Sequence, residues 1–123
     1  MKFAEDHNEA RYKITGYEPR GIKVNGSLMT QSMILTPMDL VTDWEPTRFT
    51  ELHESHLDAI YALQPDVVIL GTGEQQVFPP PAILRRLAAE KIGFEIMSTA
   101  AACRTFNIIM SEGRNIVAAL FVD

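Results

Sequence analysis

The sequence has a single cysteine, Cys103, and no long uninterrupted apolar run. One cysteine cannot close a disulfide within the chain, so the fold does not require an oxidising compartment. Glycine, proline or a charged residue interrupts every apolar stretch before it reaches the roughly 18 to 20 residues of a membrane-spanning helix. The N-terminal residues, MKFAEDHNEARYK, lack the apolar core of a secretory signal. We therefore expect a cytoplasmic protein with no transmembrane segment, whose contact with a membrane would be peripheral.

The chain also has fewer basic than acidic residues. The chain has 11 Lys and Arg against 16 Asp and Glu, for a formal net charge of −5. A surface of this charge repels phosphate backbones, so nucleic acid is not expected as a partner. The charged residues Arg85, Arg86 and Glu90 are expected on the solvated face of a helix.

The length of the chain limits the number of domains. With 123 residues, of which 46% are hydrophobic, it is long enough for one domain with its own core. Two domains would be hard to fit. We expect residues 1–10 to form a mobile N-terminal segment and residues 11–123 to form a single domain.

The C-terminal half alternates apolar strands with helical segments. DVVILG (66–71) is apolar after its first residue, which is typical of a strand covered on both faces in a parallel sheet. PPAILRRLAAEKIG (80–93) and STAAACRTFNIIMSEG (98–113) predict helices, because proline or Ser-Thr marks their start and glycine their end. FEIM (94–97) and NIVAALFV (115–122) complete a β-α-β-α-β unit, for which right-handed parallel crossovers are expected.

The N-terminal half is richer in β-branched and aromatic residues, which are interrupted by turn sequences such as Asn25-Gly26. This pattern predicts an antiparallel meander and then a helix. The strands are expected at 11–17, 21–24 and 27–35, and the helix at 55–63. The predicted fold class is a single α/β domain in which the meander packs beside the C-terminal parallel sheet. An exposed antiparallel edge in this half would also permit a homo-oligomer.

Two longer stretches, LGTGEQQVFPPP and IGFEIMSTAAACRTFNIIMSEGRNIVAALF, resemble the Mth938-like family of unknown biochemical function. The likeness is strong over residues 66–122 and weaker but collinear from about residue 14. This family includes the mitochondrial assembly factor 3 of respiratory complex I and an adipogenesis-associated protein. The resemblance implies a three-layer α/β fold and protein partners among the subunits or assembly proteins of a respiratory complex. It implies neither an established reaction nor a cofactor.

Gly71-Thr72-Gly73 follows the first strand of the C-terminal half, at the edge where open α/β sheets commonly bind ligands. Gln76 stands where a dinucleotide fingerprint needs its third glycine, and the Gly-Lys-Ser/Thr of a P-loop is absent. Two interpretations of the turn stay open. It is either a structural turn in which glycine permits close packing, or a ligand site formed by backbone N–H groups.

Parallel crossovers should bring Thr72 close to Ser98 and Thr99 at the start of the following helix. Arg104 and Asn107 share one face of that helix, because they are three residues apart. A cation and an amide can grip a carboxylate or a phosphate, or they can tie the helix to neighbouring carbonyl groups. Our hypothesis is a crevice at this edge that binds a small anion or an acidic side chain of a partner.

The remaining candidate residues have simpler explanations. Cys103 stands among alanines, which favours a buried side chain over a nucleophile. His53 and His56 are three residues apart, whereas the H-E-x-x-H signature places its histidines four apart, so no metal site is predicted. Glu112 and Arg114, at the turn into the last strand, either pair on the surface or point toward a partner.

The sequence favours a non-catalytic protein-binding module over an enzyme, because no nucleophile stands beside an evident base. By resemblance, its expected role is to assist respiratory complex I assembly or related biogenesis. The alternative is a small-anion or metabolite-binding protein, or an enzyme, that uses the crevice near the 71–73 turn. The candidate ligand- or partner-binding residues are Gly71, Thr72, Gly73, Ser98, Thr99, Arg104, Asn107, Glu112 and Arg114.

Overall fold

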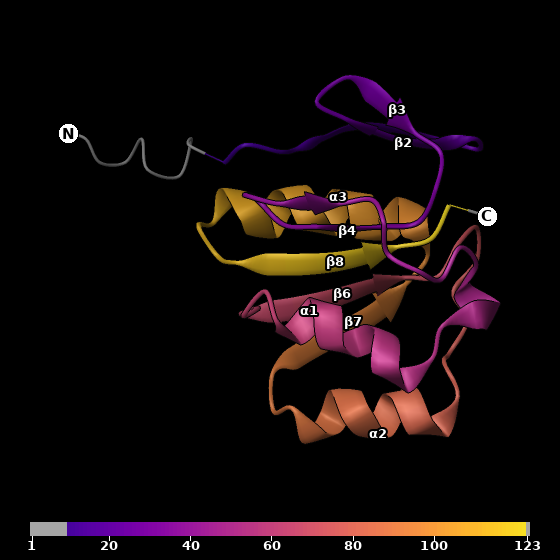
Figure 1. The fold of residues 1–123 in the computed structure, drawn as a ribbon. Coiled ribbons are helices and arrows are strands. Elements are labelled where there is room, and N and C mark those ends of the chain that lie inside the picture. Colours follow the sequence, from indigo (N-terminus) through magenta and orange to yellow (C-terminus); the bar gives the residue numbers. More distant parts are fainter. Residues whose placement is uncertain (1–9, 123) are drawn as a thin grey trace.

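The larger of two sheets is built around the C-terminal strands. The computed structural model describes residues 10–122, so residues 1–9 of the segment expected to be mobile lie outside the described part. β6 (Val67–Gly71) pairs in parallel with both β7 (Gly93–Met97) and β8 (Ile116–Leu120). The predicted parallel β-α-β-α-β unit is therefore confirmed, with its first strand between the other two (Figure 1).

Two helices connect these strands. α2 (Pro81–Ala89) begins with proline in its first turn, where the missing N–H costs no intrahelical hydrogen bond. α3 (Thr99–Ser111) is capped by the preceding residue, Ser98, whose Oγ accepts a hydrogen bond from the Ala101 N–H at 3.3 Å. Both predicted helices are confirmed, and each is somewhat shorter than its predicted range.

A separate antiparallel sheet comes from the N-terminal half. It consists of β1 (Ile14–Glu18), β2 (Gly21–Val24) and β3 (Ser27–Met29), paired in chain order. The predicted Asn25-Gly26 hairpin joins β2 to β3. Both turn residues have positive φ, at 52° and 86°, as a tight turn of this kind requires.

The single strand expected at 27–35 is wrong. Its second half, β4 (Met33–Leu35), leaves the small sheet and pairs antiparallel with β8, and β5 (Leu40–Val41) pairs with β4 at the edge. All three residues of β4 are buried, so this segment gains more by joining the larger sheet than by continuing the hairpin. Where the chain passes from the small sheet to the larger one, the Ser32 hydroxyl donates a hydrogen bond to the Pro46 carbonyl. The larger sheet is therefore mixed, with the order β5-β4-β8-β6-β7.

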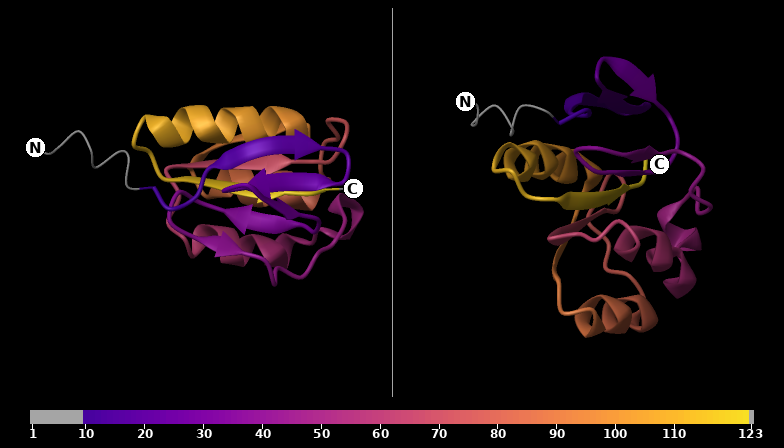
Figure 2. Two further views of the ribbon diagram at one scale, coloured as in Figure 1. Left: turned by 90° about the horizontal axis from the view of Figure 1, so that it is seen from above. Right: turned by 60° about the vertical axis from the view of Figure 1, so that its left-hand side comes forward.

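Both faces of the larger sheet are covered, and each has its own hydrophobic core. α3 and the small sheet lie side by side over one face, and α1 (Asp58–Tyr61) and α2 lie on the other (Figure 2). The helix predicted at 55–63 is present as α1 and the preceding 3-10 turn η3 (Glu54–Leu57). Trp44 is 7% exposed and belongs to the second core. The three-layer α/β fold, with the meander beside the parallel sheet, is confirmed.

Arg86 joins α2 to the segment that contains η3 and α1. Its Nη1 lies 2.8 Å from Glu54 Oε2 and 2.9 Å from Asp58 Oδ1, and its Nε lies 2.7 Å from Glu90 Oε2. Hydrogen bonds to Glu90 and Glu54 raise the pKa of the guanidinium further above its ordinary value. The solvated position expected for Arg86 is therefore wrong, because three carboxylates converge on it, from η3, from α1 and from the C-terminal end of α2 itself.

Candidate functional site

The turn at residues 71–73 is fastened to the start of α3. The Gly73 N–H donates to Thr99 Oγ1 at 2.8 Å, and the Thr99 N–H donates back to the Gly73 carbonyl at 2.8 Å. The Thr99 hydroxyl donates in turn to the Phe121 carbonyl at 2.6 Å, which links the chain just after β8 to the same point. Thr99 is fully buried. The two loops therefore approach each other as the topology predicts, and hydrogen bonds shielded from water hold them together.

Gly71 is a glycine because α3 comes too close for a side chain. A Cβ at this position would lie 3.1 Å from each of Ala102 Cβ, Leu120 Cδ2 and Thr99 Oγ1, which is tighter than ordinary van der Waals contact. Gly73 has a φ of 109°, a conformation that glycine adopts without strain. Both glycines thus have structural roles, and a ligand at this turn stays a prediction.

The polar groups around the turn are mostly engaged within the protein. Thr72 Oγ1 donates to the Gln75 carbonyl at 2.6 Å and accepts from the Val77 N–H at 3.1 Å, which shapes the loop after the turn. In the first turn of α3, the Ala100 N–H has no hydrogen-bond partner among residues 10–122, whereas the other N–H groups of that turn have one. An anion at this edge would therefore find a single free amide at the helix start.

Asn107 ties α3 to β1. Its Oδ1 accepts a hydrogen bond from the Ile14 N–H at 3.1 Å, and its Nδ2 donates to the Ile14 carbonyl at 2.7 Å. The carboxamide pairs with the outer side of β1 as a neighbouring strand would. Of the two roles open to Asn107 from the sequence, the tie to backbone groups is the one that its hydrogen bonds form.

A groove opens between β1 and the N-terminal half of α3, beside this tie. It has a volume of about 340 Å³. A second hollow of about 310 Å³ adjoins it, since Tyr17 and Ala100 line both. We call the two together the β1–α3 groove. The first part is lined by Thr15, Cys103, Arg104 and Asn107 among others, and the second by Pro19, Glu74 and Val122.

Opposite charges border the two parts of the groove. Arg104 is exposed in the first part and pairs with no carboxylate among residues 10–122. Glu74 is exposed in the second part. The phenol of Tyr17 has a raised pKa, mainly because part of the ring is buried and to a lesser extent because the Cys103 thiol and the Glu74 carboxylate lie nearby. The groove therefore has a cation on one part, a carboxylate on the other and an aromatic ring shared by both.

Sequence reasoning anticipated one wall of this groove. Arg104 and Asn107 were predicted on a shared helix face, and both line the first part. Tyr17 and Glu74 were missed. The available signal for Tyr17 was an aromatic residue directly before the Glu18-Pro19 turn, and for Glu74 it was its position directly after the 71–73 turn.

Cys103 lies at the base of the first part of the groove but is only 4% exposed. Burial raises the pKa of its thiol to about 12, although the nearby Arg104 acts in the opposite direction. The side chain is therefore a neutral thiol at physiological pH, and a thiolate is the reactive form of cysteine. This agrees with the prediction of a buried, packing side chain.

Glu112 and Arg114 lie apart from the other candidates. They follow the C-terminal end of α3, whereas the groove uses the helix from Ala100 to Asn107. Glu112 Oε1 and Arg114 Nη1 are 4.0 Å apart, and about half of each side chain is exposed. They form a local surface pair, and a role for them in partner binding stays a prediction.

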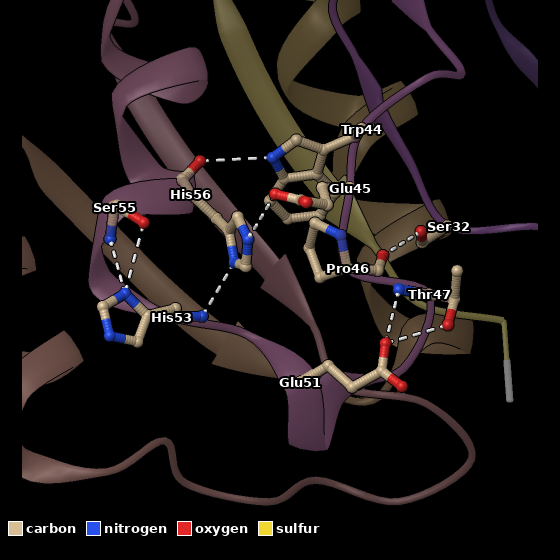
Figure 3. Close-up of polar contacts among 9 residues, drawn as sticks. All are labelled: Ser32, Trp44, Glu45, Pro46, Thr47, Glu51, His53, Ser55 and His56. Carbon is tan, nitrogen blue, oxygen red and sulfur yellow. Dashed lines mark hydrogen bonds and ion pairs between the residues drawn. The ribbon is translucent and has the colours of Figure 1, made fainter.

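The two histidines of HESH cap a turn (Figure 3). His53 Nδ1 accepts a hydrogen bond from the Ser55 N–H at 3.3 Å, and His56 Nδ1 accepts one from the His53 N–H at 2.9 Å. His56 Nε2 lies 3.3 Å from Glu45 Oε1. Both Nδ1 atoms are therefore used by the backbone. In the part of the chain that the structure describes, no group of three His, Cys, Asp or Glu side chains is placed to hold a metal ion.

Comparison with known proteins identifies a family that covers nearly the whole described fold. A family model described as "Protein of unknown function (DUF498/DUF598)" matches residues 14–121, from the start of β1 to the residue after β8. Between residues 10 and 122, no helix combines the length and the apolar character needed to cross a membrane.

Two curated relatives have names that bear on function. The "13 kDa major membrane protein" of Francisella tularensis is 30% identical over 72% of this chain and 68% of the relative. The "NADH dehydrogenase (ubiquinone) 1 alpha subcomplex assembly factor 3" of Drosophila melanogaster is 34% identical over 87% of this chain and 57% of the relative. The chain thus spans somewhat more than half the length of this assembly factor.

Solved structures have the same fold. An NMR structure of a Xanthomonas campestris protein has a TM-score of 0.84 and 39% identity, covering 99% of this chain and 92% of the other. A Bordetella pertussis protein described as a Mth938-like domain has a TM-score of 0.79 and 29% identity, covering 100% and 93%. These similarities confirm the resemblance that the sequence motifs indicated.

Proposed function

The chain belongs to the DUF498/DUF598 family, and we propose that it is a non-catalytic protein-binding module that assists the assembly of respiratory complex I. The observation that carries this proposal is the likeness to complex I assembly factor 3, which extends over nearly the whole described fold. The relative is considerably longer than this chain. The shared part spans most of this α/β fold, and we propose that it supplies the binding surface of this chain.

The β1–α3 groove supports a binding role. It is bordered by a strand edge and a helix, and extended peptides are commonly bound in grooves of this form. Its walls combine apolar groups with a few polar and charged ones, as is usual for recognition sites. The groove would therefore let the module hold a partner without any covalent chemistry.

We propose that the protein acts on the cytoplasmic side and meets a membrane-bound partner there. The Francisella tularensis relative is named as a membrane protein, which fits peripheral association with a membrane complex. The candidate contact residues are those of the groove, Arg104 first among them, together with the surface pair formed by Glu112 and Arg114. The respiratory subunits or assembly proteins themselves are the partners proposed.

Deletion of the gene tests the assembly role. The proposal predicts that the amount of assembled NADH dehydrogenase complex, measured on native gels, falls in the deletion strain. Re-expression of the wild-type chain from a plasmid should restore it. An unchanged amount of assembled complex, with the individual subunits also at normal levels, would reject the assembly role.

A small-anion site at the crevice is the second candidate. It is favoured by the exposed cation Arg104 and by the Ala100 N–H, which has no partner among residues 10–122. It is opposed by the carboxylate of Glu74 in the same groove. Thermal-shift measurements with inorganic phosphate and with short dicarboxylates test it, since a ligand that binds the native state raises its melting temperature. A shift that disappears in Arg104→Ala would support the anion site.

A further inference from the structure

β1 is an edge strand that faces the β1–α3 groove. Within the described chain β1 pairs with β2 alone, and its other side turns toward α3 (Figure 2). Asn107 occupies this outer side at Ile14. Beyond that point the pairing with β2 has an irregularity between Ile14 and Gly16, and β1 from Thr15 to Tyr17 lines the groove. An edge strand in such a position can accept an extended peptide as an additional strand.

The second part of the groove suits a basic side chain. Its walls include the apolar groups of Pro19, Ala100 and Val122 and the ring of Tyr17. Glu74 lies at the same place and brings a negative charge. The long aliphatic stem of Lys or Arg packs well on apolar and aromatic surface, and its charged head is attracted by a carboxylate. A small anion, in contrast, would be repelled by Glu74.

The first part of the groove suits an acidic side chain. Arg104 lies one helical turn beyond Ala100 on the same face of α3. It is exposed, and residues 10–122 offer it no carboxylate. An exposed guanidinium with no carboxylate beside it is a strong partner for one, because it can donate two parallel hydrogen bonds. The order of charge along the groove is therefore fixed by Glu74 and Arg104.

We propose that the β1–α3 groove binds an extended segment of a partner protein, which adds to the outer edge of β1. Its basic side chain lies against Glu74 and Tyr17, and its acidic side chain lies against Arg104. The inference rests on the proposed function, because it assigns the surface by which the module holds its partner. The inference also describes the partner segment by the order of its charged side chains, a basic one at Glu74 and an acidic one at Arg104, and not by its fold.

Selection from a library of short random peptides displayed on phage tests the inference. The wild-type chain should enrich peptides that carry a basic and an acidic residue at a constant spacing. Arg104→Glu should lower the affinity of a selected peptide by about tenfold or more, because a favourable charge pair becomes a repulsive one. Arg85→Glu makes the same charge change on α2, on the opposite face of the sheet, and should leave the affinity unchanged.

Exchange of the two charges provides the sharpest version of the test. Glu74 and Arg104 are both exposed, so the double variant Glu74→Lys with Arg104→Glu is expected to fold, which circular dichroism verifies. It should enrich peptides with the reverse order of charges. In NMR titrations of the wild-type chain with a selected peptide, the amide signals of Thr15, Gly16 and Tyr17 should shift.

Three results would overturn the inference: no enriched peptide, enrichment without a charge order, or amide shifts confined to residues outside the groove. The proposed function is tested separately. If Arg104→Glu captured the same respiratory-complex proteins as the wild-type chain, the module would still bind protein but through another surface. If peptides bound in the groove with the expected charge order while no respiratory protein was ever captured, the groove assignment would stand and the assembly role would fail.

Discussion

The carboxamide of Asn107 holds both backbone polar groups of Ile14, a residue 93 positions earlier in the chain. This pair of hydrogen bonds fixes β1 against α3 at one end of the β1–α3 groove. Asn107, which the sequence presented as a possible ligand contact, therefore sets the position of β1, the wall of the groove that faces α3. The groove depends on this long-range contact as much as on the residues that line it.

Replacement of Asn107 by alanine should loosen β1. The change removes one acceptor and one donor and leaves the Ile14 N–H and carbonyl without partners, which should lower the free energy of unfolding by about 1–3 kcal/mol. Urea denaturation measures the loss. Ser111→Ala on the same helix is the matched control, since Ser111 is exposed and its hydroxyl, within the described part of the chain, bonds to the nearby Ile108 carbonyl alone.

Hydrogen exchange shows whether the effect is local. In Asn107→Ala the Ile14 amide should lose more protection than the amides of β6 or β8, because the tie is lost while the central strands keep their pairing. Equal protection of the Ile14 amide in both proteins would show that Asn107 does not hold β1.

Gly71→Ala should be destabilising because α3 leaves no space for the added methyl group. The new Cβ would meet three neighbouring atoms at 3.1 Å each, and overpacking of this kind costs about 1–3 kcal/mol. Gly93→Ala is the control within the same sheet, since its Cβ would have no neighbour within 4 Å. Thermal unfolding of the two variants should differ clearly, and equal melting temperatures would contradict the close-packing role of Gly71.

The unfolding free energy should fall at alkaline pH partly because of Cys103. Below its ordinary pKa of 9.0 the thiol is protonated in both the folded and the unfolded chain, so its contribution to stability is fully present there. Between pH 9.0 and about 12 the unfolded chain loses the proton and the folded chain keeps it. One such group makes stability fall by about 1.4 kcal/mol per pH unit in that window.

Urea denaturation of wild type and Cys103→Ala at several pH values from neutral to alkaline checks this. Tyr17 and Tyr61 also have raised pKa values, mainly through burial, and they contribute to the slope in both proteins. The variant should therefore show a shallower decline than the wild type. Identical slopes would mean that the folded chain does not hold the Cys103 thiol protonated.

Arg86→Met should destabilise the packing of α2. It removes the cation that Glu54, Asp58 and Glu90 share and leaves these carboxylates facing one another. Because the site is partly exposed, with 21% of the Arg86 side chain accessible, the loss should be limited to about 1–2 kcal/mol. Arg85→Met on the same helix is the control and should change stability little, because Arg85 is exposed.

The strands and helices of the C-terminal half were predictable because each has a local cause. The apolar run of β6, the proline at the start of α2 and the Ser98 cap of α3 all act within a few residues. The segment 27–35, in contrast, carries no local signal that shows which sheet each of its halves joins. The division of 27–35 between the two sheets follows from burial of β4 against β8, a strand far away in the chain.

The candidate site was predictable on its helix side alone. Helical spacing placed Arg104 and Asn107 on one face, and topology placed the 71–73 turn near the start of α3. Tyr17 lies opposite because the β1–β2 hairpin packs on α3, and that packing has no local signature. Glu74 directly follows the 71–73 turn, so topology placed its backbone near α3 but did not show that it shares a groove with Tyr17. Arg86 was misread for the same reason, since two of its three carboxylate partners lie on other elements.

Affinity capture of the tagged chain from cells of the organism that encodes it, read by quantitative mass spectrometry, measures its protein-binding role directly. We expect subunits or assembly proteins of a respiratory complex to be enriched with the wild-type chain and with Arg85→Ala, and depleted with Arg104→Ala. Absence of any such protein above the level of an untagged control, in all three samples, would contradict the claim that this chain is a protein-binding assembly module.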